Sequence, residues 1–264
     1  MKAAVVGRPV AHSLSPAIWR AAFEALGLDG WTYDAVDCDA EEFARLVRRG
    51  GYAGLSVTMP HKHAAAALVD RKAGRTAGAV NTIVYGDDGT TGYNTDVDGI
   101  AAALGLVRPD GPGRVAVLGA GGTAAAAVLA AQAGGAESVT LVARNAAPAV
   151  ALRERTGGLA AFEPWTHARD VIDAADVVVN TTPAGAADDL AAGWPGAPLV
   201  DVIYDPWPTP LARAAEAGGH PVAGGLYVLV HQALRQIELV TGSRPDPEPL
   251  LAAGEAALAE RSAR

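Results

Sequence analysis

Polar residues follow several short apolar stretches in the first hundred residues, and their types suit the binding of a small, oxygen-rich anion. His12-Ser13-Leu14-Ser15-Pro16 places two hydroxyls at alternate positions just before an expected helix. Hydroxyls and helix-start amides can together hold a carboxylate, although capping of the helix by Ser15 explains the segment equally well. Other polar groups stand at expected strand ends, where the sites of open α/β sheets gather. They are Ser56, Thr58, Lys62, Asn81 and Asp96.

A glycine-rich loop in the middle of the chain predicts a dinucleotide site. Gly119-Ala120-Gly121-Gly122-Thr123-Ala124 follows the apolar run Val115–Leu118, precedes an expected helix, and fits the pattern G-x-G-x-x-A. The first glycine permits a tight turn, the second lets the backbone approach a pyrophosphate, and the small third position allows close helix–strand packing. Free amides at the helix start then meet the phosphates.

The end of the next strand indicates which dinucleotide is bound. NAD enzymes usually place Asp or Glu there to bond the ribose 2′-hydroxyl. Here Val139–Ala143 is followed by Arg144-Asn145, with no carboxylate. A guanidinium can bind a 2′-phosphate through two hydrogen bonds, so the sequence favours NADP over NAD. The alternative for Arg144 is a solvated loop cation.

These groups must be held by alternating strands and helices, which is the pattern of an α/β protein with a largely parallel sheet. Strands are expected at 3–7, 32–37, 54–58, 114–119, 138–143, 177–180, 198–203 and near 222, and helices at 16–26, 41–49, 96–104, 122–133 and 225–241. The turn signal Asp87-Asp88-Gly89 predicts a hairpin between 80–85 and 90–92. The Pro/Gly segment 108–113 marks a domain junction at or just before it, and Pro245, Pro247 and Pro249 break the chain before a final helix.

Composition excludes several classes of function. The chain of 264 residues has a net charge of −8 and no basic stripe, which argues against nucleic-acid binding. No apolar run is long enough to cross a membrane. One cysteine, Cys38, fits a reducing cytoplasm, which is the location that we expect. The motifs C-x-x-C and H-E-x-x-H and an EF-hand loop are missing, so no metal is expected.

The chain resembles the shikimate dehydrogenase family over nearly its full length. The resemblance rests on the segments 7–16, 56–62, 78–82, 94–96, 119–122, 201–204 and 225–232. It implies reversible, NADPH-dependent reduction of 3-dehydroshikimate to shikimate, a step towards aromatic amino acids. It also implies two α/β domains: a substrate-binding and catalytic domain (1–98 with 226–264, the C-terminal helices returning to it) and a Rossmann-type NADP-binding domain (99–225).

The resemblance also implies roles for individual residues. Ser13 and Ser15 would bind the substrate carboxylate, and Lys62 with Asp96 would form the catalytic pair. The groups that would contact the rest of the substrate are Ser56, Thr58, Asn81, Asp96, Tyr204 and Gln232. Those that would contact NADP(H) are Gly119, Ala120, Gly121, Gly122, Thr123, Arg144, Asn145, Thr181, Ile203 and Gly225.

The sequence departs from the family pattern at three places. Many relatives have Asn where this chain has Ser56, which shortens or removes one substrate contact. Many also carry a second basic residue shortly after Arg144, where this chain has Ala146-Ala147-Pro148. Tyr227 stands at a position that is often small in relatives, close to the expected nicotinamide site.

Chemically, hydride reduction of a ketone needs a group that stabilises and protonates the developing oxyanion. We assign that task to the Lys62 ammonium, and we assign Asp96 to orientation, substrate hydroxyl binding and proton sharing. The apolar stripe of 226–239 is expected to be buried, with Gln232 as its polar exception.

Several alternatives remain. Within the enzyme class, the substrate could be quinate or an amino analogue of shikimate. Outside it, the chain could be a catalytically silent NADP-binding regulatory relative, or another two-domain dehydrogenase such as a folate-pathway enzyme. The presence of both Lys62 and Asp96 argues against a silent relative, and the His-Ser-Leu-Ser-Pro segment argues against a folate-pathway enzyme. We expect a small-molecule partner, neither nucleic acid nor membrane, and a homodimer as a possible assembly.

Overall fold

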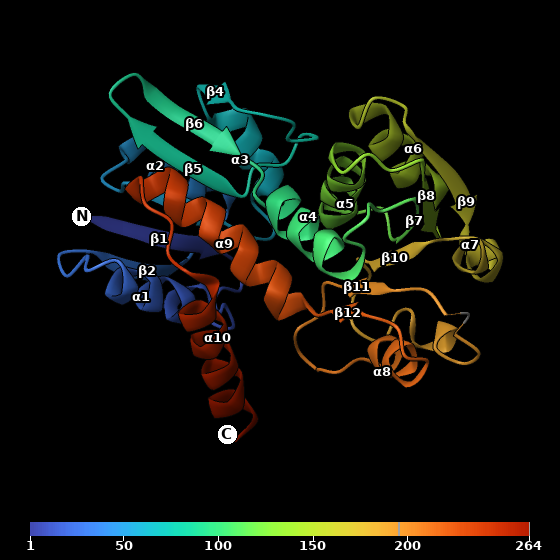
Figure 1. The fold of residues 1–264 in the computed structure, drawn as a ribbon. Helices are drawn as coiled ribbons and strands as arrows, with labels where there is room; N and C mark the ends of the chain where they lie inside the picture. Colours follow the sequence, from blue (N-terminus) through green and yellow to red (C-terminus); the bar gives the residue numbers. More distant parts are fainter. Residues whose placement is uncertain (195, 264) are drawn as a thin grey trace. The chain divides into compact units, whose positions relative to one another are not determined.

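A computed structural model describes residues 1–194 and 196–263. The chain separates into two compact units, Met1–Thr95 with Val230–Arg264 and Asp96–Leu229. Figure 1 follows the chain through both units in colour, and the C-terminal helices, in red, return to the elements of the first unit. This confirms the predicted α/β class with two domains. The Pro/Gly segment 108–113 lies inside the second unit.

The first unit is built on a mixed sheet with the strand order β2-β1-β3-β5-β6-β4. β1, β2 and β3 run parallel, whereas β5 and β6 form the predicted antiparallel hairpin. Its elements are β1 (Lys2–Gly7), α1 (Ser15–Ala25), β2 (Thr32–Asp37), α2 (Ala40–Arg49), β3 (Gly54–Val57), α3 (Lys62–Leu68), β4 (Arg71–Lys72), β5 (Thr82–Gly86), β6 (Gly89–Tyr93), most of α9 (Gly225–Thr241) and α10 (Pro247–Ser262).

Helices cover both faces of this sheet, as successive side chains of a strand point to opposite faces. Leu55 and Val57 of β3 share a buried cluster with Phe43 of α2 and Ala65 of α3. The alternate residues of β3 face α9: a Cβ atom on Gly54 would overlap Val240, and the Ser56 hydroxyl donates to Gln236. α9 therefore brings its polar side chains onto the middle strands.

The second unit is a doubly wound parallel sheet. Its strand order is β12-β11-β10-β7-β8-β9, and each pairing is parallel. Counted from β7, the unit's first strand, this is the order 3-2-1-4-5-6 of dinucleotide-binding domains, whose ligands bind where the order reverses, here between β7 and β10. Its elements are α4 (Asp96–Val107), β7 (Arg114–Leu118), α5 (Gly122–Ala133), β8 (Ser138–Ala143), α6 (Ala146–Arg155), β9 (Ala160–Pro164), η1 (Trp165–His167), α7 (Ala168–Asp173), β10 (Val177–Asn180), η2 (Asp188–Leu190), β11 (Leu199–Asp201), α8 (Pro210–Ala217) and β12 (Val222–Ala223).

Both faces of the second sheet are also covered. Ala116 and Leu118 of β7 lie in one cluster with Ile172 of α7 and Leu211 of α8. The intervening residues of β7, Val115 and Val117, are equally buried and so must be covered from the other face. Such two-sided burial explains the nearly continuous apolar character of these strands.

The structure corrects two sequence-based expectations about the helices. α10 begins at Pro247 and includes Pro249, although both were expected to break the chain before the last helix. Proline is tolerated in a first helical turn because the amide it lacks would have no partner there. In α9, Gln236 as well as Gln232 is buried, so Gln232 is not the single polar exception. No helix in the described part of the chain is long and apolar enough to cross a membrane.

Candidate functional site

The predicted substrate groups of the first unit gather where β1 and β3 end. Thr58 directly follows β3, and its amide donates to the Val6 carbonyl at 2.9 Å. Lys62 begins α3, and its carbonyl accepts from the Val80 amide at 2.9 Å. The segments that carry Lys62 and Asn81 are therefore joined through their backbones.

The Asn81 side chain is fixed in one orientation by buried neighbours. Its Oδ1 accepts from the Thr95 amide at 2.8 Å and from the Thr82 hydroxyl at 2.8 Å. Its Nδ2 consequently faces Thr95 Oγ1 at 3.0 Å and Gln232 Oε1 at 3.4 Å. Two of the predicted ring-hydroxyl ligands, Asn81 and Gln232, are thus brought together, and Asp96 follows Thr95 directly in the chain.

The predicted carboxylate-binding serines lie at the start of α1. Ser13 Oγ accepts from the Ser15 amide at 3.2 Å, and the cap residue Leu14 makes no side-chain capping bond. Ser15 is the first residue of the helix rather than its cap residue. Capping of the helix by the Ser15 side chain, the competing explanation of this segment, is therefore not what the structure shows.

Ser56 lies within β3, and its hydroxyl contacts protein groups that the sequence analysis missed. It accepts from the Tyr33 hydroxyl at 2.7 Å and donates to Gln236 Oε1 at 2.8 Å. Gln236 Nε2 continues to the Asn81 carbonyl at 3.1 Å and to Thr82 Oγ1 at 2.9 Å. The spacing of Gln232 and Gln236, one helical turn apart, was the available signal for Gln236.

Lys62 and Asp96, the predicted catalytic pair, are both partly buried. Lys62 lies in the first unit, and Asp96 opens α4 at the beginning of the second. Their cooperation remains a prediction.

In the second unit, the glycine-rich loop has the geometry that a dinucleotide loop requires. Gly119 adopts a φ of +115°, and a Cβ atom there would lie 2.5 Å from Thr181 Oγ1. At Gly121 and Gly122, no atom beyond the adjoining residues and the helix's own backbone lies within 4 Å of an ideal Cβ position. Gly121 is the N-cap residue of α5, and it has no side chain that could accept hydrogen bonds from the first amides of the helix. The loop therefore has no room for a side chain at Gly119, on the side of β10. It has free space beside Gly121 and Gly122, where a pyrophosphate would meet the start of α5.

Arg144 follows β8 as predicted and is held by two neighbours. Its Nη2 donates to the Ala186 carbonyl at 2.8 Å, and its guanidinium carbon lies 5.2 Å from the centre of the Trp165 ring. That distance is within the range of a cation–π contact. The neighbouring Asn145 caps α6 by accepting from the Ala147 amide at 3.1 Å, which gives this side chain a structural role.

A buried carboxylate organises the ends of β10 and β11. Asp201 Oδ1 accepts from Asn180 Nδ2 at 3.0 Å and from the Ile203 amide at 3.2 Å, while Oδ2 accepts from the Thr209 hydroxyl at 2.7 Å. Burial raises the pKa of Asp201, although the three donors oppose that shift. Asp201 thereby fixes Ile203, one of the predicted cofactor contacts.

Two further predicted residues adjoin Ile203. The Gly225 amide donates to the Ile203 carbonyl at 3.1 Å, and a Cβ atom on Gly225 would overlap the Val202 carbonyl. Only glycine permits this approach. Tyr204, predicted to lie beside the substrate, directly follows Ile203 and is partly buried.

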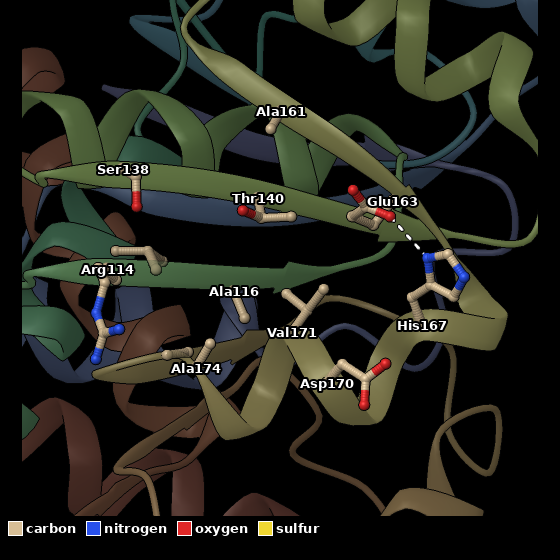
Figure 2. Close-up of a pocket in the computed structure, with 12 residues that line it drawn as sticks. Arg114, Ala116, Ser138, Thr140, Ala161, Glu163, His167, Asp170, Val171 and Ala174 are labelled. Atoms are coloured by element: carbon tan, nitrogen blue, oxygen red, sulfur yellow. Dashed lines mark hydrogen bonds and ion pairs between the residues drawn. The ribbon is translucent and has the colours of Figure 1, made fainter.

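A cavity of about 370 Å³ in the second unit is not part of the predicted site. It lies along β7, β8, β9 and α7, and its lining includes Arg114, Thr140 and Asp170 but no predicted site residue. Figure 2 shows Glu163 and His167 joined at one end of it, with a separation of 2.8 Å. Among the described residues, no group of three or more His, Cys, Asp or Glu could hold a metal ion.

The strand order and glycine-rich loop of the second unit define a dinucleotide-binding protein. Residues 114–204 match the family model described as NADP oxidoreductase coenzyme F420-dependent, and residues 5–83 match the shikimate dehydrogenase substrate binding domain. The chain is 39% identical to the shikimate dehydrogenase (NADP(+)) of Geobacter metallireducens over 92% of each chain. The chain belongs to the shikimate dehydrogenase family.

Solved structures agree with this assignment. A shikimate dehydrogenase of Mycobacterium tuberculosis is 42% identical and superimposes with a TM-score of 0.87, over 97% of this chain and 98% of that one. A shikimate 5-dehydrogenase of Thermus thermophilus, solved in complex with NADP(H) and shikimate, is 35% identical with a TM-score of 0.85, over 97% and 99%. The predicted resemblance is therefore confirmed over nearly the whole chain.

Proposed function

We propose that the protein catalyses the reversible, NADPH-dependent reduction of 3-dehydroshikimate to shikimate. The observation that carries this proposal is the fixed amide of Asn81 beside Gln232, in a chain of this family that also has an open glycine-rich loop. A relative with the same fold binds NADP(H) and shikimate together. The proposed partner is a small molecule.

The second unit fits NADP(H). The start of α5 has amides without a side-chain cap and open space beside Gly121 and Gly122. Arg144 is the cation that would donate hydrogen bonds to the 2′-phosphate, and Trp165 supports its guanidinium. We assign residues 99–225 to cofactor binding, with Ala120, Thr123, Asn145, Thr181 and Ile203 as further contacts and the Gly225 backbone facing the nicotinamide.

The first unit offers the donors and acceptors that a polyhydroxylated ring acid needs. We assign residues 1–98 with 226–264 to substrate binding. Ser13 and Ser15 would hold the carboxylate, and Asn81 and Gln232 would hold ring hydroxyls. Further substrate contacts are assigned to Thr58, Asp96 and Tyr204.

When bound, NADPH supplies the hydride for the ring carbonyl carbon. The developing negative charge on oxygen needs a nearby cation and a proton, and both come from the Lys62 ammonium in this proposal. Asp96 orients that ammonium and accepts a hydrogen bond from a ring hydroxyl. In the reverse direction the same pair removes the proton from the alcohol.

The first test is oxidation of shikimate with NADP at alkaline pH, followed by NADPH absorbance. Parallel assays with quinate and an amino analogue of shikimate, each with NADP and NAD, separate the alternatives within the enzyme class. Turnover of shikimate with NADP at the highest kcat/KM supports the proposal. Binding of NADP without turnover of any of these substrates would contradict it and would favour a silent relative.

The second test is Lys62→Ala. We expect kcat to fall by roughly 10² or more with little change in KM, since general acid–base groups contribute about 10²–10⁴. Lys72→Ala, which removes an exposed lysine of the same unit, is the matched control and should behave as the parent protein. Near-normal kcat in Lys62→Ala would remove Lys62 from the chemistry.

A further inference from the structure

Gln236 of α9 makes three buried hydrogen bonds to β3 and to the start of β5. Its Oε1 accepts from the Ser56 hydroxyl at 2.8 Å. Its Nε2 donates to the Asn81 carbonyl at 3.1 Å and to Thr82 Oγ1 at 2.9 Å. The side chain is 2% exposed, so the loss of a partner would leave a polar atom without water and carry a desolvation cost. Gln236 has no role in the proposed function so far.

The neighbours of the Gln236 amide fix its orientation. The Asn81 carbonyl can only accept, so the group beside it must be the amide nitrogen. The amide oxygen then faces Ser56, whose hydroxyl donates to it. The second proton of the nitrogen goes to Thr82 Oγ1, and the Thr82 hydroxyl donates in turn to Asn81 Oδ1 at 2.8 Å. Gln236 therefore acts on Asn81 twice, directly at the backbone and through Thr82 at the side chain.

Gln236 also determines where Gln232 lies. The two glutamines stand one helical turn apart, so their side chains leave α9 on the same face. Gln232 Oε1 lies 3.4 Å from Asn81 Nδ2 and 3.4 Å from Thr95 Oγ1. These contacts are longer than all three bonds of Gln236, so Gln236 is the firmer connection between the helix and the strands. The spacing between Gln232 and Asn81 therefore depends on Gln236.

We propose that Gln236 is a positioning residue of the substrate site. It anchors α9 to β3 and to the start of β5, and it thereby sets the spacing between Asn81 and Gln232. The Thr95 amide holds Asn81 Oδ1 on its own account, so what Gln236 adds is the position of the helix. This proposal rests on the proposed function, because it takes Asn81 and Gln232 to hold hydroxyls of one ring.

The test compares two variants of neighbouring residues in α9. Gln236→Met keeps a side chain of similar length and removes all three hydrogen bonds. Ile237→Val is the matched control, because Ile237 is fully buried and its shortening by one carbon lowers stability without removing a hydrogen bond. For each variant we would measure the melting temperature, the Kd for shikimate by calorimetric titration, and KM for shikimate and for NADP.

In Gln236→Met we expect Kd and KM for shikimate to rise roughly three- to tenfold, the effect of weakening one hydrogen bond to the substrate. KM for NADP should stay within about twofold, because its proposed contacts lie in the second unit. Ile237→Val should lower the melting temperature and leave all three constants within about twofold. Unchanged shikimate constants in Gln236→Met would overturn the proposal. An equal rise in both variants would also overturn it, because Gln236 would then be merely structural.

A double variant tests whether Gln236 acts through Asn81. Once Asn81→Ala has removed one of the two spaced ligands, their spacing no longer matters. Adding Gln236→Met to Asn81→Ala should therefore weaken shikimate binding by less than about twofold, although it weakens binding more in the parent protein. Full additivity of the two substitutions would refute the proposal.

Thr82→Val supplies a second arm that does not depend on folding of Gln236→Met. Valine suits a strand, and the substitution removes only the hydroxyl that joins Gln236 to Asn81. We expect Kd for shikimate to rise roughly two- to fivefold, and an unchanged Kd would count against the proposal. A parent protein that neither binds nor oxidises shikimate would contradict the proposed function. A parent that does both, with variants that bind shikimate equally well, would contradict the role of Gln236 alone.

Discussion

Replacing Gly119 with alanine tests whether the glycine-rich loop is shaped as the structure shows. Alanine at a φ of +115° carries a backbone strain of about 1–3 kcal/mol. Its Cβ would lie 2.5 Å from Thr181 Oγ1, which donates to the Leu118 carbonyl at 2.7 Å, so that bond of about 1 kcal/mol must also shift. The sum of about 2–4 kcal/mol corresponds to a fall in melting temperature of roughly 6–12 °C, at about 3 °C per kcal/mol.

The assay combines thermal melting without ligand and calorimetric titration with NADP. Gly119→Ala should lose both stability and affinity. Gly121→Ala has open space around its Cβ and should lose at most about 1 kcal/mol of stability, yet weaken NADP binding at least tenfold, because its methyl group would obstruct the pyrophosphate. Gly105→Ala, on the exposed side of α4, is the control for both measurements. An unchanged melting temperature in Gly119→Ala would refute the close approach to Thr181, and unchanged NADP affinity in both loop variants would refute the site.

Two other predictions concern the second unit. Trp165→Ala should raise KM for NADP by roughly two- to tenfold and KM for NAD much less, because the ring supports the Arg144 guanidinium; equal losses for both cofactors would contradict this. Asp176→Asn tests the pair with Arg114, whose hydrogen bonds lower the pKa of Asp176 to about 2. A lowered carboxyl pKa stabilises the fold above pH 4 and ceases to do so as pH falls through 2, so the variant should lose about 1 kcal/mol at pH 7 and nothing near pH 2. Asp173→Asn, an exposed neighbour, should show no such pH-dependent difference in melting temperature.

The sequence predicted the β7-α5-β8 unit almost residue by residue. Apolar runs bounded by glycine define Arg114–Leu118, Gly122–Ala133 and Ser138–Ala143. The order of this strand, helix and strand follows from the chain itself, without knowledge of long-range contacts. The two-domain class and the hairpin of β5 and β6 were also predictable from alternation and from one turn signal.

Short or weakly patterned elements were missed. α3 is a seven-residue helix with alanine at most of its positions, and α6 contains Pro148 in its first turn and has no apolar stripe. β9 is a short strand at the edge of its sheet, without alternation of apolar and polar residues. These elements are determined by what they pack against, which a single sequence does not contain.

The polar groups also divide into those that the sequence predicts and those that only the folded structure reveals. Asn81 and Gln232 could be predicted from motifs, and the structure places them together. The contact of Tyr33 with Ser56 could not be predicted, and Gln236 was signalled only by its spacing from Gln232, because these residues lie 23 and 180 positions from Ser56. Hydrogen-bond direction is likewise a property of the folded network and is not visible in residue types.

The buried carboxyl group of Asp201 determines how the polar groups around it are oriented. An amide oxygen in place of Oδ1 could still accept from Asn180 and Ile203, but an amide NH2 in place of Oδ2 could not accept from the Thr209 hydroxyl, which would have to turn and accept instead. The carboxyl group accepts from all three donors as they stand, and its burial raises its pKa. An amide at position 201 would therefore reverse the Thr209 hydroxyl, which also accepts from the Ala212 amide in the first turn of α8, so this one side chain sets the orientation of groups on both β11 and α8.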